Sequence, residues 1–176
     1  RELSVPWLLD TQSLWPGYTG TWPISGAGPG GKAFTPMGAW GIPAINTMIL
    51  LTSGATVTWA HWGLLKNKRS QLIAGLFMTV VLGISFITLQ AYEYHHAYTE
   101  LGLTMGAGVY GATFFMLTGF HGFHVTLGTI MLIVILFRSM KGHFKPDSHF
   151  GFEGVAWYWH FVDVVWLLLF VLVYWL

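Results

Sequence analysis

Four long apolar stretches dominate the sequence after its first quarter, and short polar segments separate them. The stretches cover roughly residues 43–65, 71–92, 107–137 and 154–176. A helix needs about 20 apolar residues to cross the hydrocarbon core of a bilayer, and each stretch reaches that length. Because helices are the simplest way to satisfy backbone polar groups in lipid, the pattern predicts an all-α, polytopic transmembrane helix bundle with four spans.

The first 42 residues lack this pattern. They contain a glycine-rich run between residues 26 and 31 and five prolines, namely Pro6, Pro16, Pro23, Pro29 and Pro36. Such a density of proline and glycine interrupts any helical period. We therefore expect residues 1–42 to be an extramembrane connector and residues 43–176 to be the transmembrane portion. Since the chain begins with Arg1 rather than methionine, we also expect a fragment, a processed form or the product of a split gene.

The composition agrees with a membrane protein. Hydrophobic residues make up 54% of the chain and charged residues only 9%, whereas soluble domains average about 25% charged residues. The chain has no cysteine, which excludes disulfides, thiolate metal sites and thiol nucleophiles. The sequence also has no phosphate-binding loop and no basic patch of the kind that binds nucleic acid.

The orientation in the membrane follows from the polar segments. The segment 66–70 carries three basic residues, and the segment 138–150 carries three more against one aspartate. The segment 93–106 has no lysine or arginine but has two glutamates. Because basic loops stay on the inner side of a membrane, segments 66–70 and 138–150 are predicted to face the cytoplasm or the matrix. Residues 1–42 and the C-terminus then lie on the outer side.

Three ionisable residues lie at the start of the last apolar stretch and within it. They are Glu153, His160 and Asp163. A charge at the bilayer centre costs about 2.5–3.5 kcal/mol on insertion scales, so such side chains face protein or water rather than lipid. On a helix that turns ~100° per residue, Glu153, Trp157 and His160 share one narrow arc, with Asp163 at its edge. Another part of the protein must cover this face.

Four histidines within the apolar stretches are candidate ligands. His61 and His160 are predicted at a similar depth near the inner ends of their spans, where they could ligate a haem. His121 and His124 are spaced i, i+3 and could supply two ligands to a metal. Intramembrane polar groups serve more often as hydrogen-bonding contacts between helices, so this structural interpretation stands beside the ligand interpretation.

The basic segment after the third stretch also has two interpretations. Arg138, Lys141 and His143 lie where the span meets the inner surface, at the depth of anionic lipid phosphates. An arginine can grip a phosphate through two parallel hydrogen bonds. The same residues are equally explained as the topological signal of the inner side, and the two interpretations are compatible.

Each apolar stretch carries a distinctive motif. The last stretch carries Ala-Trp-Tyr-Trp-His-Phe-Val-Asp-Val-Val-Trp at 156–166, and the third carries Thr-Gly-Phe-His-Gly-Phe-His-Val at 118–125, followed by Gly128. The second ends in Leu-Gln-Ala-Tyr-Glu-Tyr at 89–94. The first contains Asn-Thr at 46–47, Leu-Leu-Thr-Ser-Gly at 50–54 and Thr-Trp-Ala-His at 58–61. These motifs resemble subunit III of the cytochrome c oxidases, the haem-copper oxidase subunit III family. Trp22-Pro23 resembles a segment of the loop that precedes them in that family.

The resemblance implies a fold of seven helices, of which this chain is similar to helices four to seven. It implies a non-catalytic, lipid-binding subunit of a proton-pumping oxidase that stabilises the oxygen-reducing core and supports proton uptake. Such a subunit has no redox centre of its own; haem and copper would lie in subunits I and II, its expected partners together with membrane phospholipids. Cytochrome c would act on it only through the complex. Arg138, Lys141 and His143 match family positions that contact lipid head groups.

Two alternatives remain open. One is a membrane enzyme that binds its own haem or metal through His61, His121, His124 and His160, and the other is subunit III of a quinol oxidase. In the structural interpretation, the polar residues His61, His121, His124, Glu153, His160 and Asp163 serve helix packing. The family pattern is broken at Trp62 and before Arg69, which favours a bacterial inner membrane over a mitochondrial one.

Overall fold

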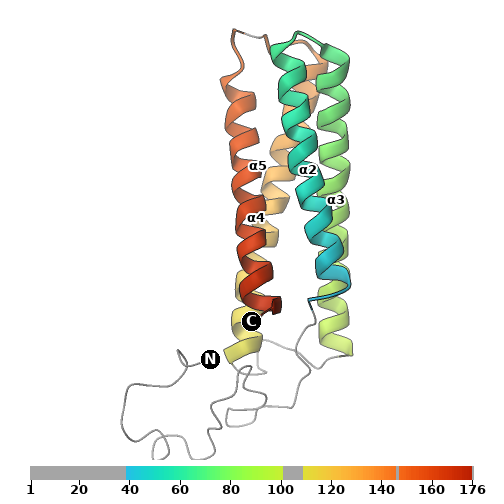
Figure 1. Ribbon diagram of the computed structural model, residues 1–176, viewed down its shortest axis with the longest axis vertical. Coiled ribbons are helices and arrows are strands. Elements are labelled where there is room, and N and C mark those ends of the chain that lie inside the picture. Colours follow the sequence, from blue (N-terminus) through green and yellow to red (C-terminus); the bar gives the residue numbers. More distant parts are fainter. Residues whose placement is uncertain (1–38, 101–108, 146, 176) are drawn as a thin grey trace, which may run out of the picture. The chain divides into compact units, whose positions relative to one another are not determined.

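The structure, a computed structural model, describes residues 39–100, 109–145 and 147–175 (Figure 1). Its elements in chain order are α2 (Ile42–Leu65), α3 (Arg69–Thr99), α4 (Val109–Met140), α5 (Phe150–Leu169) and the π-helical segment η2 (Phe170–Trp175). Within these ranges the β pairing is limited to one isolated bridge between Lys145 and Ser148. The predicted all-α membrane bundle is confirmed. Nearly all of the predicted connector 1–42, up to residue 38, lies outside the described residues.

Three helical stretches are long and apolar enough to cross a membrane: Arg69–Thr99, Gly111–Met140 and Phe150–Trp175. The helix α2 has 24 residues and begins within one residue of the predicted start, with Pro43 in its first turn. It is not among those three, because polar and small residues make up much of its buried face. These include Asn46, Thr47, Ser53 and Gly54.

Two helices run four or more residues past the ends that the sequence predicted. The helix α3 continues seven residues beyond Tyr92 to Thr99, and α5 begins at Phe150 rather than near residue 154. A glutamate lies at each of these places. Glu93 lies within α3 and its side chain is fully buried. Glu153 lies in the first turn of α5, where the free N–H groups of a helix start favour a carboxylate. A charged residue was therefore a poor marker of a helix end.

The described chain divides into two compact units. The larger contains α2, α3 up to Tyr94, α4 from Leu117, α5 and η2. The smaller includes the end of α3 from His95 and the start of α4 up to Met116. In the smaller unit Tyr98 packs on Phe115, with ring centroids 4.9 Å apart. All further sites lie in the larger unit.

Buried polar side chains join the helices of the larger unit in pairs. The indole Nε1 of Trp159 in α5 donates to Ser53 Oγ in α2 at 2.9 Å, and Trp166 Nε1 donates to Thr47 Oγ1 at 3.0 Å. The hydroxyls of Thr56 in α2 and Thr79 in α3 lie 2.8 Å apart. The helix α2 therefore bonds to α3 on one side and to α5 on another, and its polar residues are used inside the bundle. Such inter-helix hydrogen bonds hold membrane helices together.

Glycines allow the helices to approach closely. A Cβ atom on Gly75 in α3 would lie 2.7 Å from Ala60 Cβ and 3.0 Å from the Thr56 carbonyl oxygen, both in α2. Gly83 in α3 and Gly128 in α4 face the ring of Trp159 at 3.0 Å and 2.9 Å, measured from the same imagined Cβ. The indole of Trp159 is thus held between two helices that have no side chain at the point of contact.

The two basic segments begin with the same kind of helix end. After α4, Gly142 has φ 75°, its N–H bonds to the Ser139 carbonyl, and the N–H of His143 bonds to the Arg138 carbonyl. After α2, Asn67 has φ 54° and its N–H bonds to the Leu64 carbonyl. The N–H of Lys68 bonds to the Gly63 carbonyl, so the two hydrogen bonds repeat. This is the Schellman pattern, which needs a residue that tolerates positive φ. This pattern ends both helices, and basic residues lie at or directly after each end.

Candidate functional site

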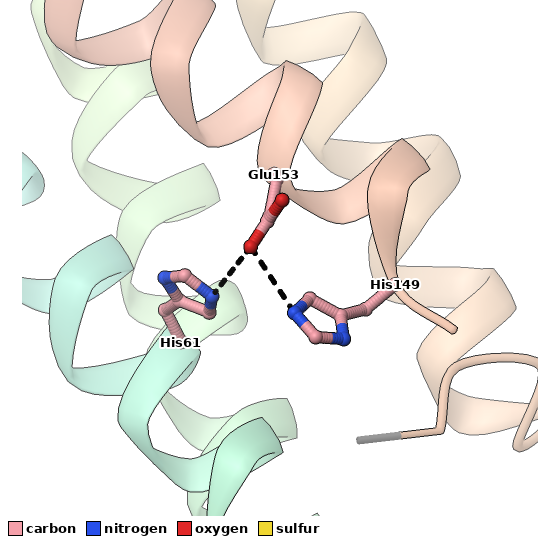
Figure 2. A group of neighbouring side chains, drawn as sticks. All are labelled: His61, His149 and Glu153. Atoms are coloured by element: carbon pink, nitrogen blue, oxygen red, sulfur yellow. Dashed lines mark hydrogen bonds and ion pairs between the residues drawn. The ribbon is translucent and has the colours of Figure 1, made fainter. Parts of the chain in front are cut away.

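Two histidines and a glutamate meet beside the start of α5. His61 lies in the last turns of α2, His149 directly precedes α5, and Glu153 is in the first turn of α5. Figure 2 shows the Glu153 carboxylate between the two imidazole rings. Its Oε1 lies 3.1 Å from His149 Nε2, within hydrogen-bonding distance, and 3.7 Å from His61 Nε2. We call these three residues the His-His-Glu cluster.

Packing orients the rings of the cluster. The imidazole of His61 lies 5.4 Å from the ring of Phe152 and 5.8 Å from that of His149, between centroids. Phe152 is fully buried and anchors this corner. The side chains of His61, His149 and Glu153 are 28%, 15% and 42% exposed. The cluster is therefore fixed by protein on one side and reachable from water on the other.

The cluster has unused hydrogen-bonding capacity. Both His61 Nε2 and His149 Nδ1 are buried and have no hydrogen-bond partner among the described residues. Buried polar atoms are nearly always paired in folded proteins. The three donor atoms of the cluster all lie within 4.8 Å of one another. Among the described residues, these are the His and acidic side chains that come this close in a group of three. Two imidazoles and a carboxylate form a donor set that can bind a metal ion.

The predicted lipid-binding residues lie together at the end of α4. The guanidinium of Arg138 stacks over the ring of Phe144 at 5.3 Å, while Lys141 and His143 are exposed. Arg69, at the start of α3, donates a hydrogen bond to the carbonyl of Met140. We call Arg69, Arg138, Lys141 and His143 the basic edge. The stacking holds the Arg138 side chain in place and leaves its charge exposed.

His160 and Asp163 face α2 across a groove rather than joining His61. His160 Nε2 lies 3.3 Å from Thr58 Oγ1, and His160 Nδ1 lies 4.0 Å from Asp163 Oδ2. Asp163 is buried against Gly54, where a Cβ atom would come within 2.6 Å of its carboxylate. The groove has a volume of about 590 Å³, and apolar residues such as Leu51, Trp62 and Leu167 form much of its wall.

His121 and His124 lie in different surroundings. His121 is buried, with its ring 5.1 Å from that of Trp166 and 5.9 Å from that of Phe86. His124 is exposed, and its Nδ1 lies 2.7 Å from the carbonyl of Phe120 in its own helix. The alternative ligand set of His61, His121, His124 and His160 is therefore dispersed over separate surroundings and forms no common group among the described residues.

Sequence reasoning missed one residue of the cluster, His149. The available signal was its i, i+4 spacing to Glu153 at the start of a helix, which brings two side chains together on one face. Glu93 was assigned by the sequence to the polar segment 93–106. It lies instead inside α3 and is fully buried, with the Gln90 amide and the Tyr174 hydroxyl from η2 near its carboxylate.

Most of this chain is similar in sequence to known proteins. A family model described as cytochrome c oxidase subunit III matches residues 9–176. A protein named cytochrome c oxidase subunit 3 from Spodoptera frugiperda is 52% identical over 143 residues, which cover 81% of this chain and 95% of the relative. Its namesake from Drosophila melanogaster is 54% identical over 150 residues, or 82% of this chain and 56% of the relative.

Mammalian proteins of the same name match as well. The one from Hippopotamus amphibius is 49% identical over 156 residues, covering 89% of this chain and 56% of the relative. The chain thus spans nearly all of the Spodoptera protein and about half the length of the other two. All three relatives come from animals, so they give no support to the expected bacterial membrane. The helices support only the broader statement that this is a membrane protein. By these matches, the chain belongs to the cytochrome c oxidase subunit III family.

Proposed function

We propose that this chain is a non-catalytic, lipid-binding subunit of a proton-pumping cytochrome c oxidase, which stabilises the oxygen-reducing core and supports proton uptake. Membership of the subunit III family supports its assembly with other oxidase subunits, for which we propose subunits I and II. The relatives reported above are named for cytochrome c, which favours this donor over a quinol. The observation that carries the lipid-binding part of the proposal is the basic edge.

The basic edge suits the phosphate of a lipid head group. Arg138 is held by Phe144 at 5.3 Å, and Lys141 and His143 are exposed beside it, directly after the end of α4. A phosphate at this place would meet a planar guanidinium, which can donate two hydrogen bonds, and a flexible ammonium group. Since the membrane surface carries the phosphates, a site at the end of a spanning helix lies at the right depth.

The groove between α2 and α5 suits an acyl chain. Its lining is largely apolar, with Leu51, Ala55, Val164 and Leu167 among its residues. An alkyl chain placed there would restore the van der Waals contacts that the open groove lacks. The polar residues at its wall, His160 and Asp163, face Thr58 and Gly54 of α2.

The buried polar side chains support a structural role in the oxidase. Four hydroxyl side chains of α2 lie within hydrogen-bonding distance of a side chain on another helix, namely those of Thr47, Ser53, Thr56 and Thr58. Their use as inter-helix contacts accounts for much of the polarity that first suggested an active site. We propose that oxygen reduction takes place in the partner subunits, which would hold the haem and copper.

Replacing Arg138 and Lys141 together with alanine is expected to weaken the binding of anionic phospholipid about 30-fold. Each basic side chain near a membrane surface contributes about 1 kcal/mol, and two such contributions multiply the dissociation constant by roughly that factor. The measurement is the amount of phospholipid that co-purifies with the oxidase, determined by mass spectrometry. The matched control removes the same charge from the other inner segment, as Lys66→Ala with Lys68→Ala. Equal lipid content in the two double variants would refute a lipid site at the basic edge.

Removing the whole subunit from the purified oxidase is expected to leave initial electron transfer intact, followed by a loss of activity during turnover. A supporting subunit affects the survival of the catalytic core, whereas a subunit with its own redox centre would be needed in every cycle. The measurement is oxygen consumption followed over successive turnovers, with the reconstituted complex as the control. Immediate and complete loss of electron transfer would assign a catalytic role to this chain.

A further inference from the structure

The predicted outer end of the larger unit contains a buried carboxyl group without a basic partner. Glu93 of α3 is fully buried. The lysines and arginines of the described residues are confined to positions 66–69 and 138–145, at the opposite ends of the helices. None of the ion pairs among the described residues includes Glu93. Since ionisable residues inside a membrane usually have a partner or mark a functional site, the surroundings of Glu93 need an explanation.

Two neutral side chains come close to this carboxyl group. Gln90 lies three residues earlier on the same face of α3, with its amide near the carboxyl group. The Tyr174 hydroxyl approaches from η2, near the end of the sequence. Both side chains are buried, with 6% and 7% of their surface exposed. We call Gln90, Glu93 and Tyr174 the Glu93 cluster.

The Glu93 cluster has more hydrogen-bonding atoms than its members use on one another. Both carboxyl oxygens of Glu93 and both amide atoms of Gln90 are buried and have no hydrogen-bond partner of good geometry among the described residues. Elsewhere in the bundle buried polar side chains bond directly, as Trp159 does to Ser53. Buried polar atoms in folded proteins are paired with protein or with ordered water in nearly every case. These atoms of Glu93 and Gln90 therefore indicate a bound molecule between them.

We propose that the Glu93 cluster is a binding site for an internal water molecule, held between α3 and η2. Water fits both kinds of atom present, because it donates to the oxygens of Glu93 and Gln90 and accepts from the Gln90 amide N–H. A metal cation would suit the oxygens alone and would be repelled by the amide hydrogens. Internal waters typically make about three hydrogen bonds to groups that are otherwise unsatisfied. The proposal goes beyond the proposed function, which uses neither Gln90 nor Glu93.

Aromatic packing holds one wall of the cluster in place. The Tyr174 ring lies 6.2 Å from the Trp166 ring and 6.1 Å from the Phe170 ring, between centroids. Trp166 is itself fully buried, and its Nε1 donates a hydrogen bond to Thr47 Oγ1. These contacts fix the Tyr174 ring independently of Glu93. A water molecule then completes the hydrogen bonds that the fixed side chains do not make directly.

The site lies a short way from the predicted outer surface. Glu93 is six residues before Thr99, the end of α3, which corresponds to about 9 Å along the helix axis. Tyr174 is carried by η2, a π-helical segment, and such segments are rare and often occur at functional sites. We therefore expect a water molecule that exchanges with the outer aqueous side and joins η2 to α3 by hydrogen bonds.

The test is hydroxyl-radical footprinting of the complete oxidase in lipid nanodiscs, with the radicals produced from water by a short X-ray pulse. Radicals formed from internal water react with the side chains beside it, so a buried residue is labelled only where it touches water. We expect oxidation of Tyr174, although it is buried, and no modification of Trp159, which is fully buried and bonded to Ser53. Trp159 is a strict control, because an indole reacts with hydroxyl radicals at least as readily as a phenol. Tandem mass spectrometry separates Tyr174 from its exposed neighbour Trp175.

Two variants of Glu93 determine whether the cluster holds the water. Glu93→Met replaces the carboxyl group with an apolar side chain of similar length, and we expect the labelling of Tyr174 to be lost. Glu93→Gln keeps polar atoms at the site and should be labelled as the wild type is. The proposal is overturned if Tyr174 in the wild type is as unreactive as Trp159, a result that does not depend on the folding of a variant. It is also overturned if Glu93→Met keeps its helix content and Tyr174 is still labelled at the wild-type rate.

Discussion

Replacing Trp159 with alanine is expected to destabilise the bundle by about 3 kcal/mol. The indole is fully buried, it donates a hydrogen bond to Ser53, and it packs on Gly83 and Gly128. Large-to-small replacements of buried aromatic residues cost about 3–5 kcal/mol in soluble proteins. We expect the lower end of that range, because lipid is as apolar as the protein interior and the lost packing carries most of the effect. The measurement is reversible unfolding in mixed micelles, followed by circular dichroism.

The chain supplies a matched control for this experiment in Trp157. That residue lies two positions away in the same helix and is 77% exposed. Trp157→Ala removes the same atoms from the outer face and should change the free energy of unfolding by less than about 1 kcal/mol. If both variants lose stability equally, Trp159 does not have the central packing role described above. The variant Trp159→Phe, which keeps an aromatic ring but loses the N–H donor, isolates the hydrogen bond.

Replacing Gly75 with valine is expected to force α2 and α3 apart and to lower stability by about 2–3 kcal/mol, at the upper end of the range for overpacked sites. The first added atom would lie 3.0 Å from both Ala60 Cα and the Thr56 carbonyl oxygen. These are backbone atoms of α2, which cannot turn aside as a side chain can. Separating the helices would also break the contact between the Thr56 and Thr79 hydroxyls, now 2.8 Å apart. Unfolding in micelles and the yield of assembled oxidase both measure the loss.

Gly122 in α4 is the control for this change. A Cβ atom there would have nothing within 4 Å, so Gly122→Val introduces the same side chain without a clash. It should remain close to wild-type stability. A Gly75→Val protein as stable as Gly122→Val would mean that α2 and α3 do not approach as closely as the structure shows.

The four helices could be predicted from the sequence because each follows from local pattern. Long apolar runs mark α3, α4 and α5, and Pro43 marks the start of α2 within one residue. Helix ends were harder to place. The buried Glu93 shows why: a charged side chain looks like a loop residue until its neighbours, here Gln90 and Tyr174, are known. Those neighbours include a residue from the other end of the transmembrane portion, which no local pattern reveals.

The polar residues were identified from the sequence, but their grouping was not. His61 was paired with His160 because the two were expected at the same depth. The structure instead places His61 beside His149 and Glu153, and turns His160 toward Thr58. Depth along a helix is readable from a sequence, whereas the direction in which each helix faces its neighbour depends on packing. The rings of Phe152 and Trp159, both fully buried in α5, set that direction.

The polar character of α2 also bears on how the protein is made. Among the described helices, α2 is not one of the three that are long and apolar enough to cross a membrane. Its hydrogen bonds to Trp159 and Trp166 require α5, which is made after α2, α3 and α4. Insertion favours helices in proportion to their hydrophobicity, and association follows in a second stage. During synthesis α2 must therefore wait for its partner, held first by α3. The arrival of α5 then completes the hydrogen bonds that hold α2 in the bundle.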